Sequence, residues 1–314
     1  PFLDRYIYRV IPDQTTTLTE LLTQNVDFYA GVSPDQAERI IADPDTELIS
    51  FPWRQYVFVG WNARRPELAD PRVRRAITLG TDRESIVDAI LQGYATVAHS
   101  SVPPFHWAFS EDRIQTLDYD PDAARALLTE AGWVDRDGDG VRENAAGVPL
   151  SISVKYNQGN QQRQDIAELM QSQLADIGIE IQPQVVEWAT LLQQINSPEL
   201  RDFDGVVMGR VEQIQLDDTD LFHCGRIDQP YAWSGTNNPE IDRLLEQLST
   251  TVDRAQAREL WVEYQNVVIE EQPYLFFYFP NQLIGASTRM QGVEMDQRGI
   301  WLNAKDWYID PDRR

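Results

Sequence analysis

Apolar runs and amphipathic stretches alternate along the whole chain. The apolar runs are rich in β-branched and aromatic residues, which favours strands. They lie at residues 5–11, 56–62, 150–156, 179–187, 205–208 and 274–279. Between them, apolar residues recur with helical spacing, most clearly in 160–178 and in about 254–271. Strands that alternate with helices from end to end predict an α/β protein, and not an all-β sandwich or a helical bundle.

The predicted helices begin and end at residues with capping chemistry. Thr81 and Glu84 fit a capping box, because their side chains can bond to the free backbone N–H groups of a first helical turn. Asp120 before Pro121 fits an N-cap followed by the first helical residue. Gly132 is placed to end that helix.

The composition is that of a folded, acidic globular protein. The chain has 314 residues, 42% of them hydrophobic, and this length suggests about two domains. Its 27 Lys and Arg against 50 Asp and Glu give a net charge of −23, which repels phosphates and anionic lipids. We therefore expect no nucleic-acid partner. The preference for Arg over Lys has two open explanations, a surface that stays hydrated in salt and a bias in genomic composition.

The sequence shows no segment of the kind that crosses a membrane or directs export. No apolar run approaches the roughly 20 residues that cross a bilayer, so we expect no transmembrane segment in this chain. There is also no basic-then-apolar signal segment at the start. Because the chain begins at Pro1 and not at Met, we expect it to be cut from a longer one.

Most catalytic signatures are missing from the sequence. It has no G-x-S-x-G, H-E-x-x-H, P-loop or G-x-G-x-x-G motif, which argues against nucleophilic hydrolysis, zinc proteolysis and nucleotide binding. A hydrolase that uses a pair of carboxylates stays open as an alternative, since acid–base catalysis needs only two well-placed Asp or Glu residues. A module that binds other proteins through its acidic surface is a third alternative.

One acidic loop matches the first part of a calcium-binding loop. The matching oxygen donors are the carboxylates of Asp135, Asp137, Asp139 and Glu143 and the backbone carbonyl of Val141. Gly140 supplies the sharp bend, but Ala146 stands where a full calcium loop has a bidentate Glu. The sequence therefore predicts either a weak Ca²⁺ site or an acidic turn that joins a helix to the strand at 150. We expect no other cofactor.

Several blocks, in order along nearly the whole chain, form a recognisable set. They are Ile11-Pro12-Asp13-Gln14-Thr15-Thr16, 62–66 with 70–77, Gly132-Trp133 with 135–140, 171–179, Val186-Glu187-Trp188 and 233–242. Together they resemble the family 5 extracellular solute-binding proteins, the oligopeptide, dipeptide and nickel receptors of ABC importers.

The resemblance implies a fold of the type II periplasmic-binding-protein class. This is a two-lobed α/β architecture with mixed sheets flanked by helices, and here the first lobe would be incomplete. Residues 1–57 and 279–314 would belong to lobe I and residues 58–278 to lobe II, with hinge strands near 56–60 and 276–281. Such receptors close two lobes on a ligand.

The resemblance also implies a function. The chain would be the non-catalytic substrate-binding component of an ABC importer, outside the cytoplasm, either periplasmic or lipid-anchored. It would capture a small polar solute and deliver it to a permease. The residues expected in the solute cleft are Asn62, Arg210, Asp217, Trp233, Ser234 and Asn237.

Arg210 is the main departure from the family pattern. It stands where the family's cleft loop usually has Trp, followed by an Asp that helps to bind a peptide's amino terminus. Two roles for Arg210 stay open, contact with the ligand and a salt bridge to Glu212 or Asp217. The departure leaves sugars, opines, short peptides and metal chelates open as solutes.

Overall fold

The computed structural model describes residues 2–310, which form two compact units. Among these residues, unit 1 comprises 2–54, 89–96 and 279–310, and unit 2 comprises 55–88 and 97–278. Residues 55–57 thus pack with unit 2 and residues 89–96 with unit 1, so the units differ at these two places from the lobe boundaries expected above. The equation of units with lobes stays a prediction.

Unit 2 is built on a mixed sheet. The strands are β3 (Gln55–Trp61), β5 (Ser151–Asn157), β6 (Glu180–Val186), β7 (Gly205–Val211) and the first part of β8 (Tyr274–Ser287). Their order is β8-β3-β7-β5-β6, in which β3 is antiparallel to both neighbours and β5 is parallel to both of its own. Gly205 lies opposite Trp61, and a Cβ on Gly205 would come 2.6 Å from the Trp61 ring, so this register requires a glycine.

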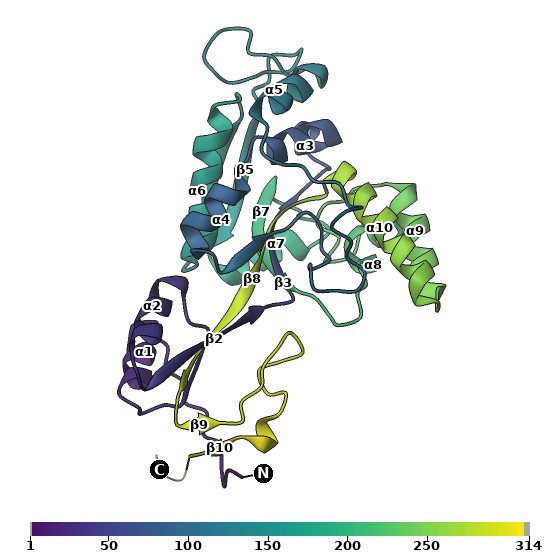
Figure 1. Ribbon diagram of the computed structural model, residues 1–314. Coiled ribbons are helices and arrows are strands. Elements are labelled where there is room, and N and C mark those ends of the chain that lie inside the picture. The colour runs from purple at the N-terminus through teal and green to yellow at the C-terminus, as the bar shows by residue number, and fades with distance from the viewer. Residues whose placement is uncertain (1, 311–314) are drawn as a thin grey trace. The chain divides into compact units, whose positions relative to one another are not determined.

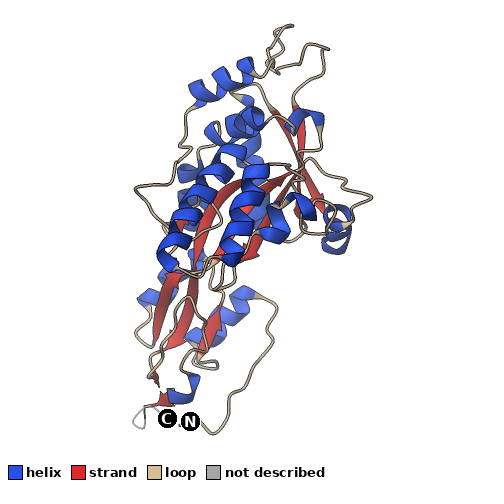
Figure 2. Ribbon diagram, turned by 90° about the vertical axis from the view of Figure 1, so that its right-hand side faces the viewer, coloured by secondary structure: helices blue, strands red, loops and turns tan. Residues whose placement is uncertain are grey.

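Most of the helices belong to unit 2, and Figure 2 draws them in blue beside the red strands. They are α3 (Pro71–Leu79), α4 (Arg83–Leu91), α5 (Pro121–Glu130), α6 (Gln161–Ala175), α7 (Trp188–Asn196), α8 (Thr219–Phe222), α9 (Pro239–Thr250) and α10 (Arg254–Glu271). Figure 1 shows α6 alongside β5, and α9 packed beside α10. The apolar stripe of α6 turns inward as its spacing predicts, because Ile166, Met170 and Leu174 are fully buried.

Unit 1 contains α1 (Gln14–Leu22), α2 (Pro34–Ala42) and short antiparallel strands. These strands are β1 (Phe28–Ala30), β2 (Thr46–Pro52), the second part of β8, β9 (Met290–Gln291) and β10 (Tyr308–Ile309). A further short strand, β4 (Ala95–Val97), also pairs with β8. Gly285 of β8 faces the helices, and a Cβ there would come 2.5 Å from Leu21 and 2.9 Å from Ile40. The helices can therefore lie close to β8 only because this position has no side chain.

Most predicted elements are confirmed, and two details are wrong. The helix expected at about 254–271 is α10, and Asp120 caps α5 by accepting the Ala123 N–H at 2.9 Å. Residues 5–11 do not form a strand, because no strand within the described residues 2–310 pairs with them. Asp82, and not Thr81, caps α4 by accepting the Ser85 N–H at 3.0 Å.

Arg74 joins α3 to the end of α10 in the interior of unit 2. Its side chain is fully buried, and Nη2 lies 2.6 Å from a carboxylate oxygen of Glu271. Nη1 donates to the Leu68 carbonyl at 2.6 Å and Nε to the Gln272 carbonyl at 3.0 Å. The buried guanidinium is therefore both paired and hydrogen-bonded, as a charge in this position must be.

Candidate functional site

The loop from β7 to α8 begins with an ion pair. Arg210 lies opposite Tyr56 in the β7–β3 ladder, and its Nε donates to Glu212 Oε1 at 2.9 Å. The Arg210 side chain is 29% exposed, whereas that of Glu212 is 2% exposed. Of the two partners expected for Arg210, the structure therefore selects Glu212, and its pairing fixes the direction of the guanidinium.

A second buried carboxylate lies at the other end of the same loop. Asp218 precedes α8 and accepts the hydroxyl groups of Ser101 at 2.6 Å and of Tyr264 at 2.8 Å. Burial raises its pKa. Burial and the nearby Asp218 charge raise the pKa of Glu212 to about 7.

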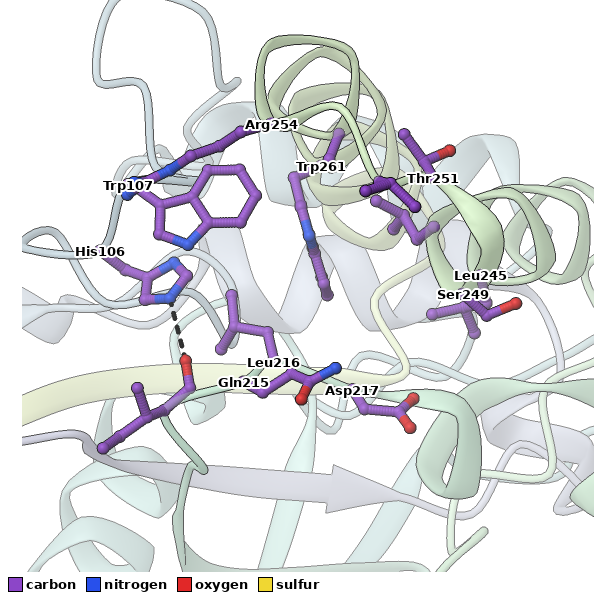
Figure 3. Close-up of a pocket in the computed structure, with 14 residues that line it drawn as sticks. His106, Trp107, Gln215, Leu216, Asp217, Leu245, Ser249, Thr251, Arg254 and Trp261 are labelled. Carbon is purple, nitrogen blue, oxygen red and sulfur yellow. Dashed lines mark hydrogen bonds between the residues drawn. The ribbon is translucent and has the colours of Figure 1, made fainter.

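A pocket of about 640 Å³ lies between this loop, α9 and α10 (Figure 3). Its walls combine aromatic, apolar and charged side chains, among them Trp107, Asp217, Leu248, Arg254 and Trp261. The Arg254 guanidinium lies 4.9 Å from the centre of the Trp107 ring. His106 fixes the wall by a 3.3 Å contact between its Nε2 and the Ile214 carbonyl. The size and lining suit a small amphipathic molecule.

Three of the expected cleft residues are brought together in the interior of unit 2. Asn62 donates from Nδ2 to the carbonyls of Arg201 and Phe203, at 3.2 and 3.0 Å. Trp233 stacks on Phe58 with ring centres 5.9 Å apart. The Trp233 Nε1 also donates to Asn196, and the Ser234 hydroxyl lies 3.1 Å from that of Thr236. All three side chains are buried and hydrogen-bonded within the protein.

Arg64 connects these residues, and the sequence did not single it out. Its Nη1 donates to the Trp233 carbonyl at 3.1 Å, and its Nη2 to the Ile227 carbonyl at 2.7 Å. The neighbouring Ala63 N–H donates to the Ser234 carbonyl at 2.8 Å. The sequence did contain one signal for Arg64. Arg64 belongs to the block at 62–66 that resembles the family, and in the structure this block contacts the second such block at 233–242.

Comparison with known proteins identifies the family. The model of the bacterial extracellular solute-binding proteins, family 5 (middle), matches residues 1–223. The oligopeptide-binding protein AppA of Bacillus subtilis is 33% identical over 312 residues, which is 98% of this chain and 56% of AppA. The chain belongs to the family 5 bacterial extracellular solute-binding proteins.

Other relatives agree with this family and with its fold. The dipeptide-binding protein of Escherichia coli is 24% identical over 302 residues, 95% of this chain and 53% of that protein. The structure of B. subtilis AppA with a nonapeptide matches with a TM-score of 0.84 and 32% identity, covering 96% of this chain and 59% of AppA. Lactococcal OppA matches with a TM-score of 0.81 and 19% identity, covering 90% and 56%.

The expected α/β fold of type II periplasmic binding proteins is therefore confirmed. The chain spans about half the length of the curated relatives it matches. No helix within residues 2–310 combines the length and the apolar character needed to cross a membrane.

In this family 5 protein, the last two residues expected in the solute cleft take no part in the hydrogen bonds around Arg64. Asp217 is exposed on the wall of the pocket, where it accepts the Thr219 N–H at 2.9 Å. Asn237 is also exposed, and its Oδ1 accepts from the Cys224 thiol at 2.8 Å. The expected cleft residues thus divide into a buried group of three, Arg210 at the end of β7, and two exposed polar side chains.

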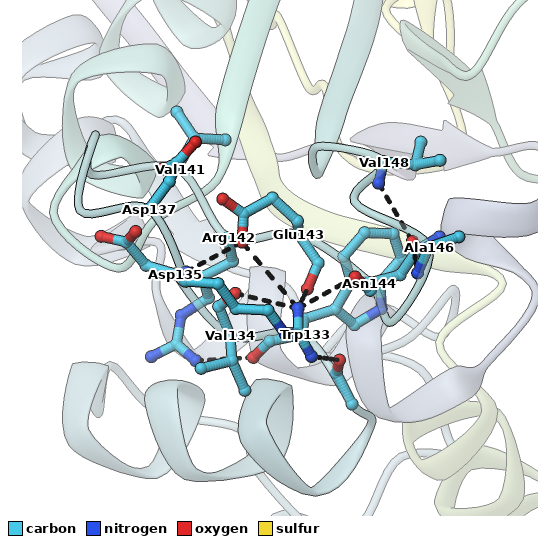
Figure 4. A network of polar contacts seen from close by, with 12 residues as sticks. Trp133, Val134, Asp135, Asp137, Val141, Arg142, Glu143, Asn144, Ala146 and Val148 are labelled. Carbon is cyan, nitrogen blue, oxygen red and sulfur yellow. Dashed lines mark hydrogen bonds and ion pairs between the residues drawn. The ribbon is translucent and has the colours of Figure 1, made fainter.

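The acidic loop brings its carboxylates together (Figure 4). Oxygen atoms of Asp135, Asp137, Asp139 and Glu143 all lie within 4.8 Å of one another. Each carboxylate also accepts a backbone N–H of the loop, as Asp135 does from Gly138 at 2.7 Å. Such oxygen donors fit the preference of Ca²⁺ for hard ligands. The same loop is the turn between α5 and β5, so the geometry is compatible with both interpretations of the sequence.

Proposed function

We propose that this protein is the solute-binding component of an ABC importer and that it captures a peptide-like solute. The observation that carries the proposal is the match over 98% of the chain to a protein named for oligopeptide binding, at 33% identity. The dipeptide-binding relative supports the same solute class. The partner would be the importer's permease, at the outer face of the membrane.

The division into two units supports closure around a solute. The chain passes between the units at residues 54–55, 88–89, 96–97 and 278–279. A few such crossings allow one unit to turn relative to another, which is how hinged binding proteins enclose a ligand. We propose that solute binding favours a closed arrangement of the units.

Arg210 is the solute contact that we propose first. Its Nε is bonded to Glu212, and among residues 2–310 the guanidinium has no other hydrogen-bond partner. With 29% of the side chain exposed, Nη1 and Nη2 can donate to a carboxylate in the bidentate geometry that arginine favours. This contact would select a solute with an anionic group.

The other expected cleft residues divide by exposure. We propose that Asp217 and Asn237 contact solute, because their polar side chains are exposed. We propose that the buried Asn62, Trp233 and Ser234 support the 232–236 segment from inside. The protein would carry out no catalysis of its own.

The test uses the whole protein purified from its host. Native mass spectrometry should find a co-purified peptide-like solute, and that solute should change the tryptophan fluorescence in a saturable, stoichiometric manner. Arg210→Ala should weaken binding at least tenfold. Arg226→Ala is the control, since Arg226 is 53% exposed and lies outside the proposed contacts. Repeated turnover of a peptide or glycoside would contradict the receptor function.

We also propose that the loop from Asp135 to Glu143 binds Ca²⁺ weakly. The convergence of four carboxylates within 4.8 Å supports a site. Ala146, at the twelfth position, supplies no side-chain oxygen, so we expect an affinity at the weak end of the range for calcium loops, near 10⁻³ M.

A further inference from the structure

The pocket of about 640 Å³ belongs to unit 2 alone. The residues that line it come from three segments that are distant in sequence, 106–107, 214–217 and 245–261. Arg210 does not line it, so the pocket gives a ligand contacts that the proposed solute contact at Arg210 does not give. The proposed function uses only Asp217 of this pocket and leaves its aromatic and apolar wall without a role.

The aromatic wall is held in place from inside. Trp261 is 5% exposed, and its ring meets that of Tyr264 edge-on, with the ring centres 5.3 Å apart. The Tyr264 hydroxyl is itself bonded to a buried carboxylate at 2.8 Å. From the same helix, Gln265 donates to the Ala108 carbonyl at 3.1 Å, which ties the residue next to Trp107 to α10. A wall that is already fixed loses little freedom when a ligand binds.

Arg254 carries the positive charge of the pocket. Its guanidinium lies 4.9 Å from the centre of the Trp107 ring, and within residues 2–310 it makes no hydrogen bond and no ion pair. Its N–H groups are therefore available to a ligand. The indole N–H groups of Trp107 and Trp261 likewise have no hydrogen-bond partner in the described part of the chain. The unpaired groups of the aromatic wall are thus donors, which suit an anion.

The other ionisable side chains of the pocket leave this charge uncompensated. His106 adds no charge at neutral pH, since burial lowers its pKa, and its Nε2 is in a 3.3 Å contact with the Ile214 carbonyl. Asp217 is exposed to water, and no ion pair joins it to Arg254. Figure 3 shows the Trp261 ring between these two side chains. Arg254 therefore has room for an anionic partner from outside the protein.

We propose that this pocket binds a carboxylate attached to a large apolar group, with the carboxylate at Arg254 and the apolar group against Trp261. The planar guanidinium matches a carboxylate in bidentate geometry. The inner wall suits the apolar group, because Leu245 and Ala257 beside Trp261 are at most 7% exposed. Two sources supply this chemistry, the last residue of a peptide and a free amphipathic acid. The inference goes beyond the proposed function, because it needs neither Arg210 nor a permease.

The first experiment follows the indole N–H signals of the whole protein, labelled with ¹⁵N at tryptophan, by NMR. The two pocket signals are assigned by their loss in Trp107→Phe and Trp261→Phe. The probe 4-phenylbutyrate should shift both in a saturable manner and leave the signal of Trp188, which is 44% exposed on α7, unchanged. Its uncharged amide should bind at least about tenfold more weakly, because the charged bonds to the guanidinium are lost. Acetate, which has no large apolar group, should give no saturable shift.

The second experiment repeats the titrations in two variants. Arg254→Ala should weaken binding of 4-phenylbutyrate at least about tenfold and leave binding of the amide unchanged, which also shows that the pocket is still folded. Arg125→Ala is the control, since Arg125 is 40% exposed and pairs with Asp122 on α5. It should bind both probes as wild type does. Equal affinity of wild type and Arg254→Ala for 4-phenylbutyrate would overturn the inference.

The peptide Ala-Ala-Phe distinguishes the two sources. If the natural ligand is the end of a peptide, Ala-Ala-Phe should shift the Trp107 and Trp261 signals at lower concentration than 4-phenylbutyrate does. If it is a free acid, only 4-phenylbutyrate should shift them. Either result supports the inference, and the absence of any shift with both probes would overturn it.

The same measurements separate this inference from the proposed function. Calorimetric binding of Ala-Ala-Phe, with no probe shifting the Trp107 and Trp261 signals, would overturn the inference and leave the receptor function intact. Shifts caused by 4-phenylbutyrate, with no binding of the peptide, would support the inference and count against the proposed solute class.

Discussion

The guanidinium of Arg64 lies directly against the backbone of Gly235. A Cβ added at Gly235 would come 2.2 Å from Arg64 Cζ, and the Gly235 backbone has a φ of +60°. Arg64 could move aside only by giving up its bonds to the Trp233 and Ile227 carbonyls. Gly235 is therefore needed both for the backbone conformation and for the position of Arg64.

Gly235→Ala should destabilise the protein by about 2–3 kcal/mol, as judged by urea unfolding. Gly138→Ala is the matched control, because Gly138 has a φ of +81° but no atom within 4 Å of a new Cβ. Gly138→Ala should lower the free energy of unfolding by only about 1 kcal/mol, which is the cost of placing Ala in a left-handed backbone conformation. An equal loss of stability in Gly235→Ala and Gly138→Ala would show that the contact with Arg64 does not contribute to the effect of Gly235→Ala.

Breaking the Arg74–Glu271 pair should cause a larger loss of stability. Arg74→Leu would remove the cation paired with the Glu271 carboxylate, which would keep only its bond from Asn238, and would take the Arg74 donors away from the Leu68 and Gln272 carbonyls. We expect unfolding to become easier by about 3–5 kcal/mol. Arg72→Leu, in the same helix, would break an exposed pair with Asp70 at 2.6 Å and should change the stability little. Similar effects of the two variants in urea unfolding would contradict this reasoning.

Glu212 should also make stability depend on pH. Its pKa is raised to about 7 in the folded protein, whereas an unfolded Glu ionises near 4.5. Between these values the folded state binds more protons than the unfolded state, so this contribution to stability is complete below about pH 4.5 and is lost as pH rises through 7. The free energy of unfolding should be measured at pH 5 and at pH 8. From pH 5 to pH 8 it should fall by about 2–3 kcal/mol more in wild type than in Glu212→Gln. Equal changes in both proteins would contradict the raised pKa.

Local patterns were enough to predict most of the fold. The range of α10 follows from its apolar spacing, and Asp120 capped α5 because a cap depends on residues only a few positions away. The strand expected at 5–11 failed because a strand also needs a partner to pair with, and the alternation of side chains does not provide one.

The site depends on contacts that are distant in sequence. Arg64 bonds to carbonyls more than 160 positions away, so no local spacing could reveal it. Trp233 and Asn62 were expected in a cleft from the resemblance to the family, but the resemblance does not decide whether a side chain is buried. Arg210 and Glu212 are two positions apart, and their pair could be predicted for that reason.

Calcium provides a test of the acidic loop that is independent of solute. Chelator-treated protein given Ca²⁺ at about ten times a Kd near 10⁻³ M should gain about 1.4 kcal/mol, which is a rise in Tm of about 3 °C. Asp137→Asn should reduce the rise, because Asp137 supplies one of the four convergent carboxylates. Asp122→Asn is the control, since Asp122 is 93% exposed and lies on α5 outside the loop. A wild-type Tm that does not respond to Ca²⁺ would leave the loop as a turn whose carboxylates serve only its own backbone N–H groups.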